Sequence, residues 1–104
     1  MNEKLKAEEH RDRTEMELEE AKRLLEIMLN SDEATLAEYE KMEDEVTALE
    51  VEYEKAKFEA HVQGLMAAFR NVPAYELKKT VKAKYGYADV VKEAAKRVLA
   101  EKAA

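Results

Sequence analysis

The sequence predicts an all-α protein built on a long antiparallel helical hairpin, coiled-coil-like, with two short C-terminal helices packed at one end. Ala, Glu, Lys, Leu and Arg supply 65 of the 104 residues, a composition typical of long helices and coiled coils. Only Gly64, Gly86 and Pro73 interrupt it, and no alternating β-branched run indicates a strand. We therefore expect a single helical domain over residues 1–104, with a core small enough to make self-association as a homodimer an expectation.

Two long helical segments are expected to form the hairpin, over residues 14–29 and 33–70. Residues 30–32 read Asn-Ser-Asp, which supplies a helix stop and a new helix start, and nothing strong breaks the second segment before Pro73. Residues 1–13 are mostly charged, so little tertiary contact can form there. We expect a mobile arm over those residues rather than a core element.

Apolar residues recur in a heptad pattern along both segments. They step by 3, 4 and 3 residues on the first segment, and by 3, 4, 3, 4 and 3 on the second. An antiparallel pairing would set Ala21 beside Val46 and Leu25 beside Met42, so that small residues face larger ones. We call this set the hairpin seam; its members are Leu18, Ala21, Leu25, Met28, Tyr39, Met42, Val46, Leu49, Tyr53 and Ala56.

Other apolar residues lie off the hairpin seam and are candidates for contact with a protein partner. Beyond Ala56 the apolar stripe moves to the opposite side of the helix, so that part needs a separate neighbour. Either the C-terminal region or a second subunit could supply it. The candidate partner-binding residues are Leu24, Ile27, Leu36, Val51, Phe58, Val62, Leu65 and Phe69.

The C-terminal region predicts two short helices, over residues 73–84 and 88–102. Pro73 suits a first helical turn, and Gly86 is expected to act as a left-handed C-cap between the two helices. The buried stripe of the last helix is expected to consist of Val91, Ala94, Ala95, Val98 and Leu99.

Charge is divided along the chain. Residues 1–60 carry 20 acidic and 9 basic side chains, whereas residues 61–104 carry 4 acidic and 9 basic ones, so the overall charge of −6 describes neither part. In the basic part, lysines could meet phosphates and tyrosines could stack on bases. The possible nucleic-acid contacts are Lys78, Lys79, Lys82, Lys84, Tyr85, Tyr87, Lys92, Lys96 and Arg97.

No constellation in the sequence supports catalysis or a cofactor. There is no Cys, the only Ser is Ser31, and the residues three positions before His10 and His61 are Ala7 and Phe58 rather than the Glu of a carboxylate-bridged metal site. We expect no enzyme activity, no metal, no cofactor and no small-molecule substrate. No apolar run approaches the roughly 18 residues that span a membrane, and no secretory signal is evident, so we expect a cytoplasmic protein without membrane contact.

These observations favour a non-enzymatic protein–protein interaction module, acting as an adaptor, regulator or inhibitor through the acidic hairpin. The partner would be another protein or a second copy. Two alternatives remain. The basic C-terminal helices could bind nucleic acid, or the acidic hairpin could mimic nucleic acid and inhibit an enzyme that processes it.

Overall fold

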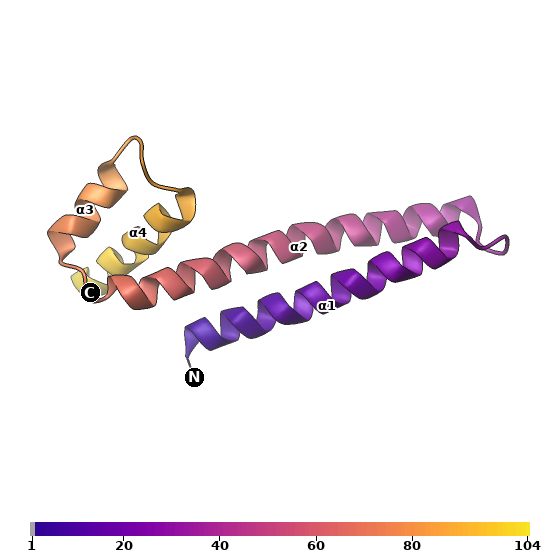
Figure 1. Cartoon of the computed structure of the whole chain (residues 1–104), viewed down its shortest axis with the longest axis horizontal. Helices are drawn as coiled ribbons and strands as arrows, with labels where there is room; N and C mark the ends of the chain where they lie inside the picture. The colour runs from indigo at the N-terminus through magenta and orange to yellow at the C-terminus, as the bar shows by residue number, and fades with distance from the viewer. Residues whose placement is uncertain (1) are drawn as a thin grey trace. The chain divides into compact units, whose positions relative to one another are not determined.

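The computed structural model describes residues 2–104 and consists of four helices there, with no strand. The long helices are α1 (Glu3–Leu29) and α2 (Leu36–Phe69), and the short ones are α3 (Ala74–Lys82) and α4 (Asp89–Ala103). Helices α1 and α2 form the hairpin, and α3 packs against α4 (Figure 1). The all-α prediction with a long hairpin and two short C-terminal helices is confirmed.

The chain divides into two compact units. The hairpin unit comprises Glu8–Lys57, and the C-terminal unit comprises Phe58–Ala104 together with residues 2–7. Helix α2 runs unbroken through the boundary between Lys57 and Phe58. One helix therefore supplies residues to both units.

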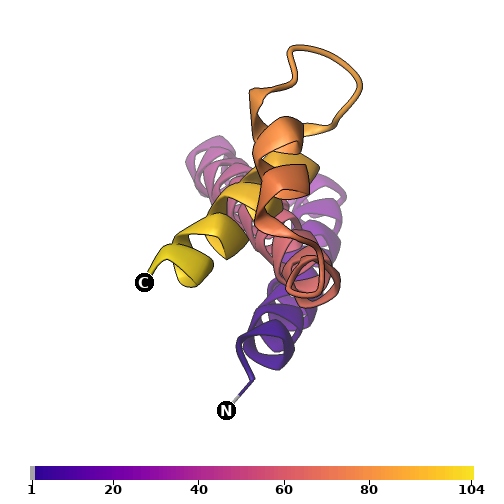
Figure 2. The ribbon, with the colours of Figure 1, turned by 90° about the vertical axis from the view of Figure 1, so that its left-hand side faces the viewer.

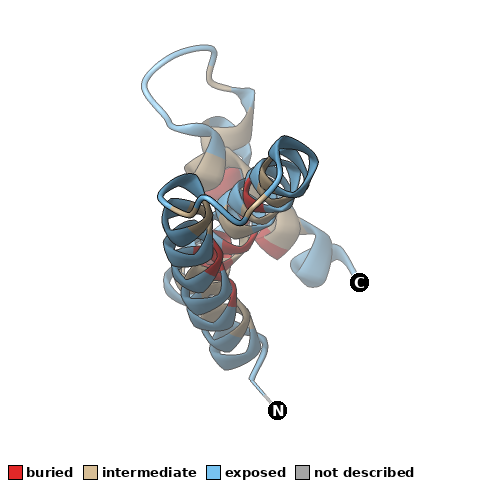
Figure 3. Ribbon diagram, turned by 90° about the vertical axis from the view of Figure 1, so that its right-hand side faces the viewer, coloured by how far each residue is buried: buried red, intermediate tan, exposed pale blue. Residues whose placement is uncertain are grey.

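The hairpin seam forms the interior of the hairpin unit. Leu18, Ala21 and Val46 are its buried centre, and Leu25 and Tyr53 are among the half-buried residues that pack against it. All ten predicted seam residues are buried or half-buried, and Figure 3 shows the buried positions of the molecule in red. The 3–4 spacing in the sequence thus identified the residues by which α1 and α2 meet.

The seam extends toward the N-terminus through a polar residue. Thr14 lies four positions before Leu18 and is 2% exposed. Its hydroxyl donates a hydrogen bond to the carbonyl oxygen of His10 at 2.7 Å, so the buried polar atom is satisfied. Helix α1 begins at Glu3 and so includes residues ahead of the hairpin segment expected over 14–29, and the mobility of residues 1–13 stays a prediction.

Helix α2 begins at Leu36, three residues later than the expected position 33, because Thr35 is its N-cap. The backbone N–H of Glu38 donates to the Thr35 hydroxyl oxygen at 3.2 Å, and that hydroxyl donates to the Glu38 carboxylate at 3.1 Å. The first bond is the N-cap half of a capping box, whereas the Glu38 carboxylate accepts from the Thr35 hydroxyl rather than from the Thr35 backbone N–H. Residues 30–35 therefore form the turn of the hairpin.

The core of the C-terminal unit covers the apolar stripe at the end of α2. Its buried residues come from α2, α3 and α4, and Leu65 and Phe69 pack against them as half-buried neighbours. The second neighbour that the stripe required is therefore the C-terminal region of the same chain. We call this cluster the C-terminal core; it consists of Val62, Met66, Leu77, Ala94, Ala95 and Val98.

The connection between α3 and α4 differs from the expected one. Helix α3 ends at Lys82 with Ala83 as its C-cap, whereas Gly86, with φ +96°, lies in the middle of the loop. Gly86 is therefore not the C-cap, although it does adopt the positive φ that favours glycine. The Ala83 carbonyl accepts a hydrogen bond from the Lys92 ammonium, so α4 completes the end of α3.

Candidate interaction surfaces

Apolar side chains gather at the turn of the hairpin unit, where no other element covers them. Ile27, Leu29 and Leu36 are 58%, 65% and 72% exposed. They adjoin a hollow of about 330 Å³ lined by residues from both sides of the turn. We call this the hairpin tip surface; it consists of Ile27, Met28, Leu29, Ala34, Leu36 and Tyr39.

Local contacts within the turn fix the positions of the residues that form the hairpin tip surface. Ala34 precedes the N-cap and Tyr39 is the fourth helical residue of α2, and both line the hollow, which is the arrangement of a hydrophobic staple. On the other side, the backbone N–H of Ser31 donates to the Met28 carbonyl at 3.2 Å. The apolar side chains therefore project from an ordered turn.

Carboxylates are frequent in the segment that carries the hairpin tip surface. Residues 24–40 contain five acidic side chains and no basic one. All five are exposed, and none forms an ion pair within residues 2–104. They are Glu26, Asp32, Glu33, Glu38 and Glu40. The turn thus combines exposed apolar side chains with five exposed carboxylates that form no ion pair in the described part of the chain, which we call the acidic rim.

The remaining candidates for protein contact fall into two groups. Leu24, Val51 and Phe58 are exposed, as expected, although only Leu24 lies near the turn in sequence. Val62 is fully buried, and Leu65 and Phe69 are half-buried against the C-terminal core. The expectation that these three would be exposed is therefore corrected, because α3 and α4 occupy the face that they form.

Phe58 borders a second hollow, of about 320 Å³, within the C-terminal unit. Its other lining residues come from α3 and α4 and carry both signs of charge. They are Val81, Asp89, Lys92, Glu93 and Lys96. Because acids and bases alternate around this hollow, it has no net preference for a charged ligand.

The lysines of α3 lie on its outer face. At 100° per residue, Lys78, Lys82 and Lys79 fall within an arc of about 100°, opposite the buried Leu77. Tyr75 lies inside the same arc, with the Lys79 Nζ atom 5.8 Å from the centre of its ring. We call this set, continued by Lys84 and Tyr85 in the following loop, the basic face of α3; it consists of Tyr75, Lys78, Lys79, Lys82, Lys84 and Tyr85.

Two of the predicted nucleic-acid contacts on α4 are instead engaged within the C-terminal unit. The Arg97 guanidinium donates to Glu59 of α2 at 2.7 Å and to Glu93 of α4 at 2.8 Å. The Lys92 ammonium is engaged with the Ala83 carbonyl. Both side chains therefore hold helices together, whereas Lys96 is exposed and forms no ion pair within residues 2–104.

Ion pairs made by residues of α4 perturb the ionisation of their members. The hydrogen bond from Arg97 holds the pKa of the Glu59 carboxyl below its ordinary value, and the same contact raises the pKa of Arg97. Arg70 forms a two-pronged pair with Glu101, at 3.0 Å for each bond, and this lowers the pKa of the Glu101 carboxyl. Such pairs favour the charged forms and tie α4 to the end of α2.

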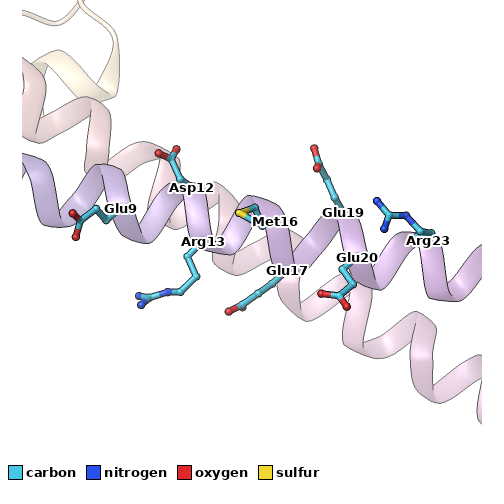
Figure 4. Close-up of a pocket in the computed structure, with 8 residues that line it drawn as sticks. All are labelled: Glu9, Asp12, Arg13, Met16, Glu17, Glu19, Glu20 and Arg23. Atoms are coloured by element: carbon cyan, nitrogen blue, oxygen red, sulfur yellow. The ribbon is translucent and has the colours of Figure 1, made fainter.

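A hollow of about 620 Å³ lies along the outer side of α1. Eight residues line it, and all of them belong to α1. Figure 4 shows charged side chains that project to both sides of Met16. A single helix supplies no opposing wall, so this hollow cannot enclose a small-molecule substrate.

The histidines do not build a metal site within the described residues. His10 Nε2 lies 3.3 Å from the Glu52 carboxylate and His10 Nδ1 lies 3.2 Å from the Arg13 guanidinium. Across residues 2–104, no group of three His, Cys, Asp or Glu side chains is placed to hold a metal ion. In the same range, no helix has the length and apolar character needed to cross a membrane.

Comparison with models of known protein families, with curated proteins and with solved structures finds no match to this chain.

Proposed function

We propose that the protein is a non-enzymatic protein–protein interaction module whose contact surface is the hairpin tip surface. The observation that carries the proposal is the exposure of Leu29 and Leu36, 65% and 72%, at an ordered turn whose segment, residues 24–40, carries five carboxylates. A large aliphatic side chain gains about 1.5–3 kcal/mol on full burial, so a partner that covers both leucines gains a substantial part of a micromolar affinity.

The charge of the rim indicates the chemistry of the partner. Five carboxylates within residues 24–40, a segment that contains no basic residue, favour a partner segment that carries Lys or Arg around an apolar centre. An amphipathic basic helix has this character, because its apolar stripe can cover the leucines while its basic flanks meet the rim. The same charges disfavour contact between two tips, since both surfaces are acidic. The proposed partner is therefore a different protein.

The proposal is tested by affinity capture from the native host with matched baits, followed by quantitative mass spectrometry. The baits are the natural chain, Leu36→Asp and Val51→Asp. Val51 is 52% exposed on the hairpin but lies outside the hairpin tip surface, so its substitution adds the same charge at a comparably exposed site. Proteins captured by the natural chain and by Val51→Asp, and lost from Leu36→Asp, support the proposal.

A purified captured protein then gives the quantitative test. Leu36→Ala should weaken its binding about tenfold or more, because truncation of an anchor at the centre of an interface costs at least about 1–2 kcal/mol. Retention of the same proteins by all three baits would contradict the proposal. Circular dichroism of each bait establishes that the helices are intact.

A further inference from the structure

We propose that the basic face of α3 binds single-stranded nucleic acid, with lysines on the phosphates and Tyr85 stacked on a base. This surface and its ligand are separate from the hairpin tip surface and its protein partner. The two proposals can therefore fail independently.

The spacing of the lysines on this face suits the regularly spaced phosphates of a nucleic-acid backbone. Lys78 and Lys82 are four residues apart on one side of the arc, about 6 Å along the helix axis. Residues 74–88 contain four lysines and a single acid, Glu76, and none of these lysines forms an ion pair within residues 2–104. Their charge is therefore available to a ligand.

The neighbouring helix does not cancel this charge. On α4, Glu93 is paired with Arg97, and Glu101 is paired with Arg70, which directly follows α2. Two of the four acids in residues 61–104 are thereby neutralised, which leaves Glu76 and Asp89 against the lysines of α3. At about 0.1 M salt the screening length is about 10 Å, so the sign of the local cluster, rather than the overall charge of −6, decides which ligand approaches.

The exposure of Tyr85 favours unpaired bases as the ligand. Tyr85 is 88% exposed, so its ring packs against almost nothing in the protein. It precedes Gly86, whose φ of +96° turns the loop, and Figure 2 shows the α3–α4 loop projecting away from the two helices that it joins. A projecting tyrosine offers a face on which one base can stack, and in a duplex the faces of the bases are covered by their neighbours. This favours a single strand over a duplex.

The test is fluorescence anisotropy of the full chain with a labelled single-stranded oligothymidine of about 15 nucleotides, a length that covers the usual site size. The matched duplex is measured in parallel. Four lysine contacts predict a slope of about −3 when the logarithm of affinity is plotted against the logarithm of salt concentration. Replacing two lysines, Lys78→Gln with Lys82→Gln, should reduce the slope to about −1.5.

Matched variants separate this site from general charge and from folding. Lys41→Gln with Lys55→Gln removes the same charge from exposed lysines of the hairpin unit and should leave the affinity and slope nearly unchanged. Tyr85→Ala should weaken single-strand binding about 5- to 100-fold, the loss expected for one stacked base, whereas Tyr85→Phe keeps the ring and should bind like the natural chain. Because Tyr85 is exposed, neither change threatens the fold.

Several results would overturn the proposal. One is no anisotropy change at about 50 mM salt with up to about 100 μM protein, the weak limit of non-specific nucleic-acid affinity. Another is tighter binding to the duplex with no effect of Tyr85→Ala. A third is equal losses from the hairpin lysines and the α3 lysines. Sedimentation with vesicles of phosphatidylserine and phosphatidylcholine, without oligonucleotide binding, would assign the lysines to an anionic membrane instead and would also overturn it.

Discussion

Two polar residues hold positions where an apolar side chain would be expected, and in both the polar atom has a partner. Thr14 continues the hairpin seam, with its hydroxyl bonded to the His10 carbonyl. Lys92 is half-buried beside the C-terminal core and completes the end of α3. Thr14 lies four residues before Leu18 and so fits the 3–4 spacing of the hairpin seam. A search for hydrophobic residues alone misses it, because its side chain is polar. The Lys92 contact depends on the loop path and could not be predicted from the sequence.

The two glycines should respond to alanine with opposite signs. Gly64 lies inside α2, and an added Cβ would meet nothing within 4 Å, so Gly64→Ala should raise the free energy of unfolding by about 0.5–1 kcal/mol. Gly86 has φ +96°, a backbone conformation that residues with an L side chain rarely adopt. Gly86→Ala should therefore lower the free energy of unfolding by about 1–2 kcal/mol. Urea unfolding followed by circular dichroism measures both. Changes of the same sign in the two variants would contradict this difference between Gly64 and Gly86.

At the scale of elements, the sequence predicted which faces meet but not where α2 begins. The hairpin seam follows from a heptad spacing that only one helix face can satisfy. The start of α2 was missed because residues 35–38, Thr-Leu-Ala-Glu, fit both a helix interior and a capping box. Likewise, the lysine-rich composition of the C-terminal region indicated the basic face of α3, whereas the pairing of Arg97 with Glu59 depends on how α4 packs on α2.

The pairing of α4 with α2 should appear in the pH dependence of stability. Because the pKa of the Glu59 carboxyl is lowered in the folded protein, the pair stabilises the fold above the ordinary pKa of 4.5, and this contribution is lost as pH falls through the folded pKa. Arg97→Met should therefore lower the free energy of unfolding near pH 7, and this effect should diminish as the pH falls below 4.5 and through the folded pKa of Glu59. The loss should stay within about 1 kcal/mol, because both side chains are partly exposed to solvent.

Lys96→Met is the matched control for Arg97→Met, since it removes a positive charge from the same helix at an exposed position. Thermal or urea unfolding at several pH values compares the two variants. An equal pH dependence in both would show that the pair contributes no measurable stability.

At the scale of the whole molecule, protection should differ between the two units. The C-terminal core joins six buried residues, whereas the buried centre of the hairpin seam joins three. Less burial means cheaper local opening, so hydrogen exchange should be slowest in residues 94–98 of α4, faster in the hairpin unit and fastest in residues 3–13. Mass spectrometry after timed exchange measures this. Uniform protection along the chain would instead indicate one cooperative unit and would contradict the mobile arm.

In the folded protein, the acidic and basic parts of the chain form two distinct surfaces. The negative charge is uncompensated at the hairpin turn, and the positive charge is uncompensated on α3. On α4, several of the charged side chains form ion pairs within the protein. Net charge by segment could be computed from the sequence, but which charges face solvent unpaired depends on the packing.

The continuity of α2 across both units has a consequence for the order of folding. The first turn of a helix is its least favourable step, because several backbone angles are fixed for one hydrogen bond, and each later residue adds on more easily. The contacts between α3 and α4 are local in sequence, and local contacts form early. Once Val62 and Met66 are helical against them, the hairpin part of α2 can grow from an existing end and needs no nucleus of its own.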